Sequence, residues 1–414
     1  MANLEFYLSR KILNSGNSGK SAGPIVKVAT LGVTIGMCIM LLSVFIITGF
    51  KNEVTSKIVG FSSAINVVAA SKTVEGDEVG INPTKRLIDT LKSIDGVSEI
   101  YDYIEKPAIL KAGQEIHGVL LKGMSSKYNG NFFKDYLLDG NYPDYSSFKT
   151  SDSILISSQI ALYLNVKVGD KITSHFVQNP PRVRVFRVAG IYSTGVKEFD
   201  NSIVVCDLRH LRKLNAWKSH RVTGLAINIE DMNKLDIVED KVGNVIEEIK
   251  WGEFMMLNDL RQNSYQIFDW LNLLDMNVWI ILILVTIVAG FNMVSGLLIL
   301  ILDKSTMIGI LKALGYRNIK LKKLFLYVAM GLVGKGMFYG NILAFILAGI
   351  QYYFHPLSLN PDVYYMEMVP INFSVIYIVV LNLAVLFLTM LMLILPTSLV
   401  SKIDPIKIIS FGES

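Results

Sequence analysis

The sequence predicts an α-helical membrane protein with four transmembrane helices and an α+β extracytoplasmic domain inserted between spans 1 and 2. Composition is the first observation behind this prediction. The chain of 414 residues is 51% hydrophobic and only 18% charged, whereas soluble domains average about 25% charged residues. Distribution is the second observation, because four long runs hold the apolar excess. The segment from about Lys51 to Trp270 has the composition of an ordinary soluble domain, and it is long enough for one sizeable core or for two small subdomains.

The four apolar runs are the predicted spans. They are residues 28–50, 278–302, 324–354 and 373–399. A bilayer core takes about 20 apolar residues of helix, and each run reaches that length. A cleaved signal peptide is the alternative for the first run. We favour a retained anchor because the run exceeds a typical signal-peptide core and residues 48–51 offer no small-x-small cleavage site.

Positive charge predicts the orientation of the chain. Four spans place both termini on one side of the membrane, together with the linker at residues 303–323. The N-terminal segment (residues 1–27), this linker and the tail (residues 400–414) all carry Lys or Arg, so that side is expected to be the cytoplasm. The domain at residues 51–257 and the loop at residues 355–372, which has no Lys or Arg, are then outside.

The outer domain alternates short strand and helix patterns, which predicts an α+β fold. Asn82 and Pro83 suit the N-cap and first position of a helix that reaches Ile94. Residues 109–116 suggest a hairpin. The other predicted strands are residues 153–156, 182–192, 202–206 and 224–229, and the other predicted helices are residues 159–164, 207–214 and 231–249.

Helical spacing returns at Asn258, with Leu260, Ile267 and Leu271 on one face. No Gly or Pro interrupts the pattern for several turns. We therefore expect residues 258–302 to form one continuous helix, which starts as an amphipathic stalk outside the membrane and becomes the second span. Such a stalk would carry rigid-body motion between the outer domain and the cytoplasm. A helix that is merely packed on the domain is the alternative.

Motifs for catalysis or metal binding are missing from the sequence. Residues 16–21 resemble a phosphate-binding loop, but Asn14 stands where that motif needs its first Gly. The His residues do not pair with each other or with Cys at metal-ligand spacing. Cys38 lies in a span and Cys206 in the outer domain, so we expect no disulfide. The predictions are therefore no enzyme activity, no catalytic residue, no metal and no cofactor on this chain. Its basic clusters flank spans, which fits membrane topology better than nucleic-acid binding.

The linker between spans 2 and 3 contains a short amphipathic helix, Ser305–Leu314, closed by a Gly at the C′ position. Its apolar residues suggest one patch rimmed by Lys304 and Lys312. Such a patch lies either on the membrane interface or in a groove on a partner protein. The residues of this helix and of its closing turn that are candidates for such a contact are Ser305, Ile308, Gly309, Ile310, Leu311, Lys312, Ala313, Leu314 and Gly315.

Five segments, in order along the chain, carry a resemblance to a known family. They are Leu42–Gly60, Val188–Asp200, Ile308–Gly315, Asp362–Ile371 and Asp404–Lys407. Ile308–Gly315 resembles the segment of FtsX/MacB-type ABC permeases that sits on the ATPase as a coupling helix. This resemblance favours a groove on a partner over the membrane interface, and it makes the candidate residues of that helix the candidate coupling residues. The other segments resemble lipoprotein-releasing permeases of the LolC/LolE type. The chain is identified as a member of that superfamily, with a MacB-like periplasmic core domain as its outer domain.

The resemblance implies a bacterial inner-membrane permease that extracts lipoproteins, without enzyme activity of its own. The implied partners are two copies of an ABC ATPase subunit that bind ATP and Mg, a second permease copy or paralogue, membrane lipid and the lipoprotein substrate. A periplasmic lipoprotein carrier is a further possible partner. In the family a longer hairpin grips that carrier, and the corresponding turn here, Gln178, Asn179, Pro180 and Pro181, is short.

Extraction of acyl chains costs about 0.8 kcal/mol per CH₂ group, and so tens of kcal/mol for three chains. An apolar cavity is therefore implied as well. Its candidate lining residues come from spans 1 and 2, and ordinary lipid-facing residues are the alternative. They are Met40, Leu41, Val44, Ile47, Thr48, Leu271, Leu274 and Val278. Because four spans are few for a transport path, we also expect a dimer of permeases.

Two other functions remain open from the sequence. One is a MacB-like efflux permease for peptides or antibiotics, although such permeases usually carry a fused ATPase domain that is absent here. The other is a non-transporting FtsX-like mechanotransducer that controls a cell-wall hydrolase, although its outer domain is usually much smaller.

Small and charged residues within the spans give two further expectations. Gly32 and Gly36, and likewise Gly336 and Gly340, have the small-xxx-small spacing that permits close helix packing.

Lys335 lies about three turns past Lys323 and so near mid-membrane. We expect Lys335 to be buried between spans, with Asn292, Asn341 or Asn382 as its partner, and to matter for assembly or coupling.

Overall fold

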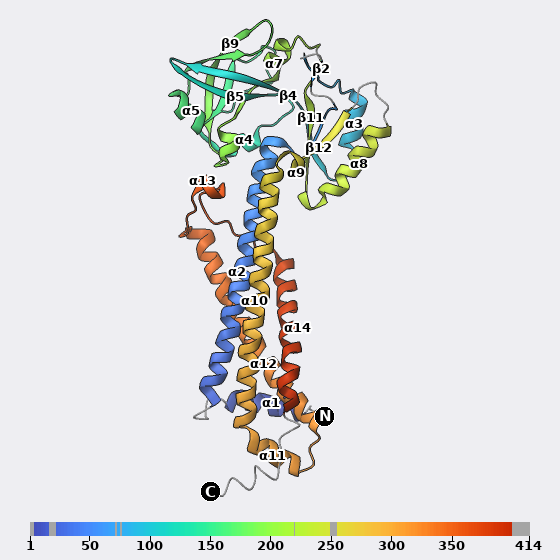
Figure 1. The fold of residues 1–414 in the computed structure, drawn as a ribbon, viewed down its shortest axis with the longest axis vertical. Coiled ribbons are helices and arrows are strands. Elements are labelled where there is room, and N and C mark those ends of the chain that lie inside the picture. The colour runs from blue at the N-terminus through green and yellow to red at the C-terminus, as the bar shows by residue number, and fades with distance from the viewer. Residues whose placement is uncertain are drawn as a thin grey trace. The chain divides into compact units, whose positions relative to one another are not determined.

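The computed structural model describes residues 4–15, 22–70, 73–74, 77–218, 220–248 and 255–399. The chain divides into two compact units, which we call the helical unit and the sheet unit (Figure 1). The helical unit comprises residues 1–51, 270–357 and 369–414, and the sheet unit comprises residues 52–269 and 358–368. The loop-like motif at residues 16–21 and the tail at residues 400–414 lie outside the described residues.

Long helices dominate the helical unit. They are α2 (Ala22–Ser62), α10 (Tyr265–Asp303), α12 (Asn318–Phe354) and α14 (Val375–Leu399). Within the described part of the chain, these four are long and apolar enough to cross a membrane, so the four predicted runs are confirmed as helices. The shorter α1 (Leu4–Ser15) and α11 (Ser305–Ala313) complete this unit. With 41 and 39 residues, α2 and α10 each contribute residues to both units.

Close helix packing at the predicted glycines is confirmed. A Cβ atom added to Gly336 on α12 would lie 2.7 Å from the Cβ of Val33 on α2. Gly340 approaches α2 equally closely one turn later, while Gly32 and Gly36 lie against α10. The small residues therefore hold α2 against both of its neighbours.

The expectation that Lys335 is buried between spans is wrong, because its side chain is exposed on α12. Two of its expected partners bond to each other instead. Asn341 Nδ2 donates to Asn382 Oδ1 over 2.8 Å, and Asn382 Nδ2 donates to Asn341 Oδ1 over 3.1 Å. This reciprocal pair joins α12 to α14 with neutral groups.

A ten-stranded sheet is the frame of the sheet unit. In spatial order its strands are β12 (Met255–Asp259), β1 (Ile65–Ala69), β11 (Gly224–Ile229), β4 (Val97–Ala112), β5 (Glu115–Met124), β10 (Ile203–Asp207), β7 (Ser153–Ser157), β9 (Arg182–Tyr192) and β6 (Leu137–Gly140), and β8 (Lys171–Phe176) pairs with β4 and β9. β2 (Thr73–Val74) pairs with β3 (Asp77–Glu78). The β5–β10 and β7–β9 pairs are parallel and the others antiparallel, which confirms the α+β class.

Short helices accompany the sheet. They are α3 (Lys85–Lys92), α4 (Asn131–Asp135), α5 (Ser158–Leu164), α6 (Lys197–Asp200), α7 (Leu208–Leu214), α8 (Leu235–Glu248), α9 (Leu260–Asn263), α13 (Pro361–Tyr364) and the 3-10 turn η1 (Met232–Lys234). The first of them begins later than predicted, because Thr84 rather than Asn82 is the N-cap. Thr84 Oγ1 accepts a hydrogen bond from Leu87 N over 3.3 Å.

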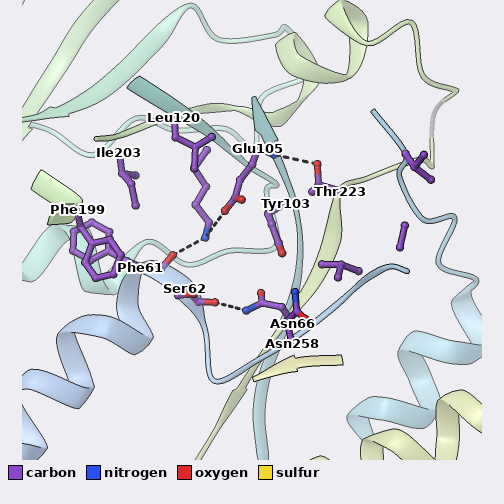
Figure 2. Close-up of a pocket in the computed structure, with 14 residues that line it drawn as sticks. Phe61, Ser62, Asn66, Tyr103, Glu105, Leu120, Phe199, Ile203, Thr223 and Asn258 are labelled. Atoms are coloured by element: carbon purple, nitrogen blue, oxygen red, sulfur yellow. Dashed lines mark hydrogen bonds and ion pairs between the residues drawn. The ribbon is translucent and has the colours of Figure 1, made fainter. Parts of the chain in front are cut away.

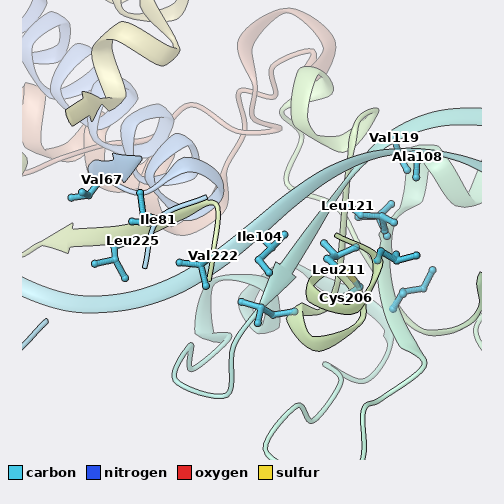
Figure 3. Close-up of a cluster of buried hydrophobic side chains, with 14 of the residues drawn as sticks. Val67, Ile81, Ile104, Ala108, Val119, Leu121, Cys206, Leu211, Val222 and Leu225 are labelled. Carbon is cyan, nitrogen blue, oxygen red and sulfur yellow. The ribbon is translucent and has the colours of Figure 1, made fainter. Parts of the chain in front are cut away.

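Figure 3 shows part of the main apolar core of the sheet unit. Val67 from β1, Ile104 from β4, Leu121 from β5 and Leu211 from α7 are fully buried there. Cys206 lies in the same core as a free thiol. Burial raises the pKa of that thiol, so Cys206 behaves as a small apolar residue.

The predicted stalk helix begins later than Asn258. Asn258 and Asp259 end strand β12, and Asp259 then caps α9 by accepting a hydrogen bond from Gln262 N over 2.7 Å. Ser264 has non-helical angles and separates α9 from α10. Strand pairing satisfies the backbone of residues 255–259 and replaces the helix that their apolar spacing suggested.

The predicted outer loop at residues 355–372 divides between the two units. Residues 358–368 belong to the sheet unit. Ser358 pairs with Met368 as an isolated bridge, and Leu359 N donates to Glu367 O over 2.8 Å. These bonds fold the segment on itself and give it a defined shape.

Candidate functional site

The coupling candidate α11 ends in a two-bond C-terminal motif. Tyr316 N donates to Leu311 O over 2.9 Å, and Gly315 N donates to Lys312 O over 3.0 Å. Gly315 has a φ of 82°, which favours Gly at this position. The predicted C′ glycine is confirmed, and the motif fixes the direction in which the chain leaves the helix.

The apolar residues of α11 lie on two faces, which corrects the single patch that we expected. Ile308 is fully buried in the core of the helical unit, Gly309 is also buried, and Leu311 packs against that core. Ile310 and Leu314 are 51% and 79% exposed. This exposed pair is therefore the apolar surface of α11 that a partner can reach.

The remaining coupling candidates lie around that surface. Ser305 and Lys312 are half-buried, and Ala313 and Gly315 are exposed. Helix α1 packs on α12 close to the linker, where the rings of Phe6 and Tyr327 meet edge to face at 6.1 Å. No local sequence pattern predicts that contact.

Three of the eight predicted cavity residues pack inside the chain. Met40, Leu41 and Leu271 are at most 1% exposed, so in this structure they touch neighbouring side chains and do not line open space. These three residues lie on the inward faces of their helices, and their part in a cavity stays a prediction. The other five, Val44, Ile47, Thr48, Leu274 and Val278, are half-buried, and their role stays a prediction.

The predicted carrier-binding hairpin is the turn between β8 and β9. Gln178 Nε2 donates to Leu214 O over 3.3 Å, which ties the turn to α7. The preceding Val177 is 86% exposed. A role of Gln178–Pro181 in binding a partner stays a prediction.

Lys57 is the centre of a polar cluster in the sheet unit that we did not single out as a site. Its side chain is only 6% exposed, and Glu53 Oε1 lies 3.7 Å from Nζ. Nζ donates to the carbonyl oxygen of Tyr365 over 2.8 Å and lies 5.4 Å from the ring centre of Tyr136. The i,i+4 spacing of Glu53 and Lys57 is the one sequence signal that points to this cluster.

The segment Val188–Asp200 builds the other side of the same cluster. Asp200 accepts hydrogen bonds from Thr194 Oγ1, Thr194 N and Gly195 N at 2.8–3.1 Å. Burial raises the pKa of Asp200, and these bonds oppose that shift. A Cβ on Gly195 would lie 3.3 Å from Tyr365 O, so the turn at Gly195 packs directly against that carbonyl group.

The C-terminal end of α2 is capped by side chains from the sheet (Figure 2). Lys122 Nζ donates to Phe61 O over 2.5 Å and pairs with Glu105 at 3.2 Å. Ser63, with a φ of 63°, ends the helix, and its hydroxyl lies 2.9 Å from Tyr101 Oη. A cation at the carboxyl end of a helix also favours its dipole.

Neighbouring strands connect the end of α2 with the start of α9. The chain leaves α2 into β1 and reaches α9 from β12, and these two strands pair along the whole of β1. Leu260 N adds a hydrogen bond to Ala64 O over 3.0 Å. Displacement of α2 against α9 would therefore have to break backbone bonds of the sheet.

Metal chemistry has no geometric support in the part of the chain that the structure describes. No group of three or more His, Cys, Asp or Glu side chains there is placed to hold a metal ion.

The order of these parts along the chain agrees with two family models. The model of the MacB-like periplasmic core domain matches residues 28–245, more than half of the chain. The chain belongs to this family. The model of the FtsX-like permease C-terminal region matches residues 279–405. This member of the MacB-like family is thus a multi-pass membrane protein with a periplasmic domain.

Curated relatives match over nearly the full chain. The lipoprotein-releasing system transmembrane protein LolE of Haemophilus influenzae is 22% identical and covers 99% of both chains. The transmembrane protein LolC of the same system from Buchnera aphidicola is 24% identical, with 93% of both chains covered. LolC from Neisseria meningitidis is 22% identical, with 99% of this chain and 100% of the relative covered.

Two solved structures align with the chain at low similarity. The extracellular domain of the ABC-type transporter YknZ from Gram-positive bacteria is 15% identical, with a TM-score of 0.33 and coverage of 46% of this chain and 98% of its own. The periplasmic region of MacB from Actinobacillus actinomycetemcomitans is 13% identical, with a TM-score of 0.36 and coverage of 51% and 95%.

Proposed function

We propose that the chain is the permease subunit of an ABC transporter that extracts lipoproteins from the inner membrane for delivery towards the outer membrane. The observation that carries this proposal is the match, over nearly the whole chain, to transmembrane proteins of lipoprotein-releasing systems. ATP hydrolysis takes place on a separate ATPase subunit with its ATP and Mg. This chain supplies binding and mechanical work, without a catalytic residue.

The ATPase subunit, present in two copies, docks on α11. The exposed pair Ile310 and Leu314 supports this assignment, because an apolar pair needs a cover that excludes water. Ile308 on the same helix is buried in the core of the helical unit, so a force on α11 is transmitted directly to that core. Both termini and α11 are cytoplasmic in this arrangement, and the sheet unit is periplasmic.

The movement reaches the periplasmic domain through α2 and α10. The Lys122 cap on α2 and the β1–β12 pair support this route, since the cap fixes the end of α2 to the sheet and the strand pair connects α2 with the strand that precedes α9. A second permease copy or a paralogue completes the transport path. Val44, Ile47, Thr48, Leu274 and Val278 line its apolar cavity, where the acyl chains are sheltered, and a carrier takes the lipoprotein in the periplasm.

A release assay tests the proposal. The chain is reconstituted with its ATPase in vesicles that hold a fluorescent triacylated lipoprotein, and the lipoprotein in the soluble fraction is measured with and without ATP in the presence of a lipoprotein carrier. We expect ATP-dependent release, and none in a matched preparation with Leu314→Asp. Release that is equal with and without ATP contradicts the proposal and favours the efflux or signalling functions.

A further inference from the structure

A cavity of about 370 Å³ opens in the sheet unit beside the capped end of α2 (Figure 2). This volume lies in the range of small-ligand pockets and is far larger than the roughly 30 Å³ that one water occupies. All of its lining residues belong to the sheet unit. The function proposed above makes no use of this space.

One wall of the cavity is apolar. Phe61 from α2 and Phe199 from α6 stack with ring centres 4.7 Å apart. Leu120 from β5 and Ile203 from β10 continue this wall. Such a surface favours an apolar group of a ligand over a shell of ordered water.

The opposite wall offers hydrogen-bond acceptors. Asn66 is 3% exposed, and its Nδ2 donates to Ser62 O over 2.6 Å. Its Oδ1 is buried and has no hydrogen-bond partner in the described structure. Glu105 also lines the cavity, and its side chain is 33% exposed. A buried acceptor of this kind is normally satisfied, so the site is built to receive a donor.

The cation of the cavity is already engaged. Lys122 is the one Lys or Arg among the described lining residues. Its Nζ bonds Phe61 O and Glu105 and lies 4.8 Å from the ring centre of Tyr103. A phosphate or carboxylate would therefore meet the Glu105 carboxylate and compete for a lysine that is already paired. An anionic lipid headgroup does not fit this wall.

We propose that the cavity binds a short segment of a polypeptide. The backbone N–H groups of the peptide donate to Asn66 Oδ1 and Glu105, and an apolar side chain of the peptide rests against Phe199 and Leu120, which are partly exposed in the cavity. A peptide offers both features within a few atoms of each other, and its amides carry no charge that the Lys122–Glu105 pair would oppose. This site adds a peptide-binding role to the periplasmic domain and does not require a lipid anchor on the ligand.

Photocrosslinking tests the site in the full chain, assembled with its ATPase in nanodiscs. The photoreactive residue p-benzoylphenylalanine replaces Leu120, which lines the cavity, or, as a control, Leu162, which is 77% exposed on α5. The probe is a short biotinylated peptide of alternating alanine and leucine with blocked ends. We expect labelling from position 120 that unlabelled peptide competes away, and none from position 162.

Two substitutions of Asn66 separate binding from folding, because both remove the bond to Ser62 O. Asn66→Asp keeps an acceptor in the cavity, whereas Asn66→Leu does not. We expect labelling to survive in Asn66→Asp and to fall about tenfold in Asn66→Leu, in line with the loss of one hydrogen bond to a buried group. Basal ATPase activity and elution volume check that both variants are assembled.

Three results would overturn the proposal: no peptide labelling in the parent protein, equal labelling in Asn66→Leu, or adducts at position 120 that contain only lipid. Stimulation of the ATPase by a triacylated lipoprotein is measured on the same samples. Peptide labelling without that stimulation would support this site and contradict the lipoprotein-release function. Stimulation without peptide labelling would support the lipoprotein-release function and contradict this site.

Discussion

Lys57 Nζ donates a hydrogen bond to the carbonyl oxygen of Tyr365 over 2.8 Å inside the sheet unit. Lys57 lies on α2, and Tyr365 lies in the segment that separates α12 from α14. A lysine this deeply buried must be paired. The bond therefore attaches the segment at residues 358–368 to α2. This segment is the only described part of the chain after Asp269 that belongs to the sheet unit.

The first prediction concerns this attachment. Lys57→Met should destabilise the segment at residues 358–368 by about 2 kcal/mol, since it leaves the Tyr365 carbonyl group without its charged donor. Hydrogen exchange of that segment measures the effect. Lys134→Met is the matched control, because Lys134 also donates to a backbone carbonyl, Asn129 O, but at an exposed site. Equal protection of residues 358–368 in both variants would show that the bond does not hold the segment.

The second prediction separates docking from stability on α11. Leu314→Asp should abolish stimulation of the partner ATPase while thermal stability of the permease is kept, because Leu314 is 79% exposed. Ile308→Ala should instead destabilise the helical unit by about 2–4 kcal/mol through a cavity in its core. Co-purification and thermal unfolding distinguish the two effects. A Leu314→Asp variant that still binds and stimulates the ATPase would exclude α11 as the docking surface.

The third prediction compares two glycines on α12. Gly336→Ala should cost about 1–3 kcal/mol, because the new methyl group would lie 2.7 Å from Val33 Cβ. Gly334→Ala should be neutral or slightly stabilising, because no heavy atom lies within 4 Å of its added Cβ and Ala is the better helix former. Unfolding in detergent measures the stability of both variants, and equal stability would contradict close packing of α2 against Gly336.

The fourth prediction concerns pH. Burial lowers the pKa of His210, and the nearby Asp152 carboxylate only partly opposes this shift. The unfolded chain therefore takes up a proton at this residue at a higher pH than the folded chain. The contribution of neutral His210 to folding stability is therefore present above the pKa of His in the unfolded chain, about 6.5, and is lost as pH falls below that value.

His210→Gln should reduce the loss of thermal stability between about pH 7.5 and about pH 5.5. Glutamine can still donate to Ser151 O, which His210 Nε2 contacts at 3.0 Å. His220→Gln is the control because His220 is exposed. If His210→Gln lost stability with falling pH as steeply as the parent protein, titration of His210 would not be the cause.

Local patterns predicted much of the fold. Residues 182–192 and 224–229 alternate as strands do, and Gly315 stops α11 where a left-handed residue is needed. Hydropathy located the four long helices. It gave the depth of Lys335 along its helix but not the direction of its side chain, because direction depends on which helices pack beside it.

The parts that the sequence did not predict depend on partners far away in the chain. The spacing after Asn258 is helical, and only the pairing of β12 with β1 makes this stretch a strand. Lys122 caps α2 from a strand that no local rule connects to a helix end. The bond between Lys57 and Tyr365 spans most of the chain, so neither residue carries a local signal of the other.

ATPase activity of the chain with its ATPase in nanodiscs, measured with and without a triacylated lipoprotein, is the most direct test of the proposed function. We predict stimulation by the acylated lipoprotein and none by the same protein without its lipid. Equal activity under all three conditions would contradict lipoprotein extraction as the function of this permease.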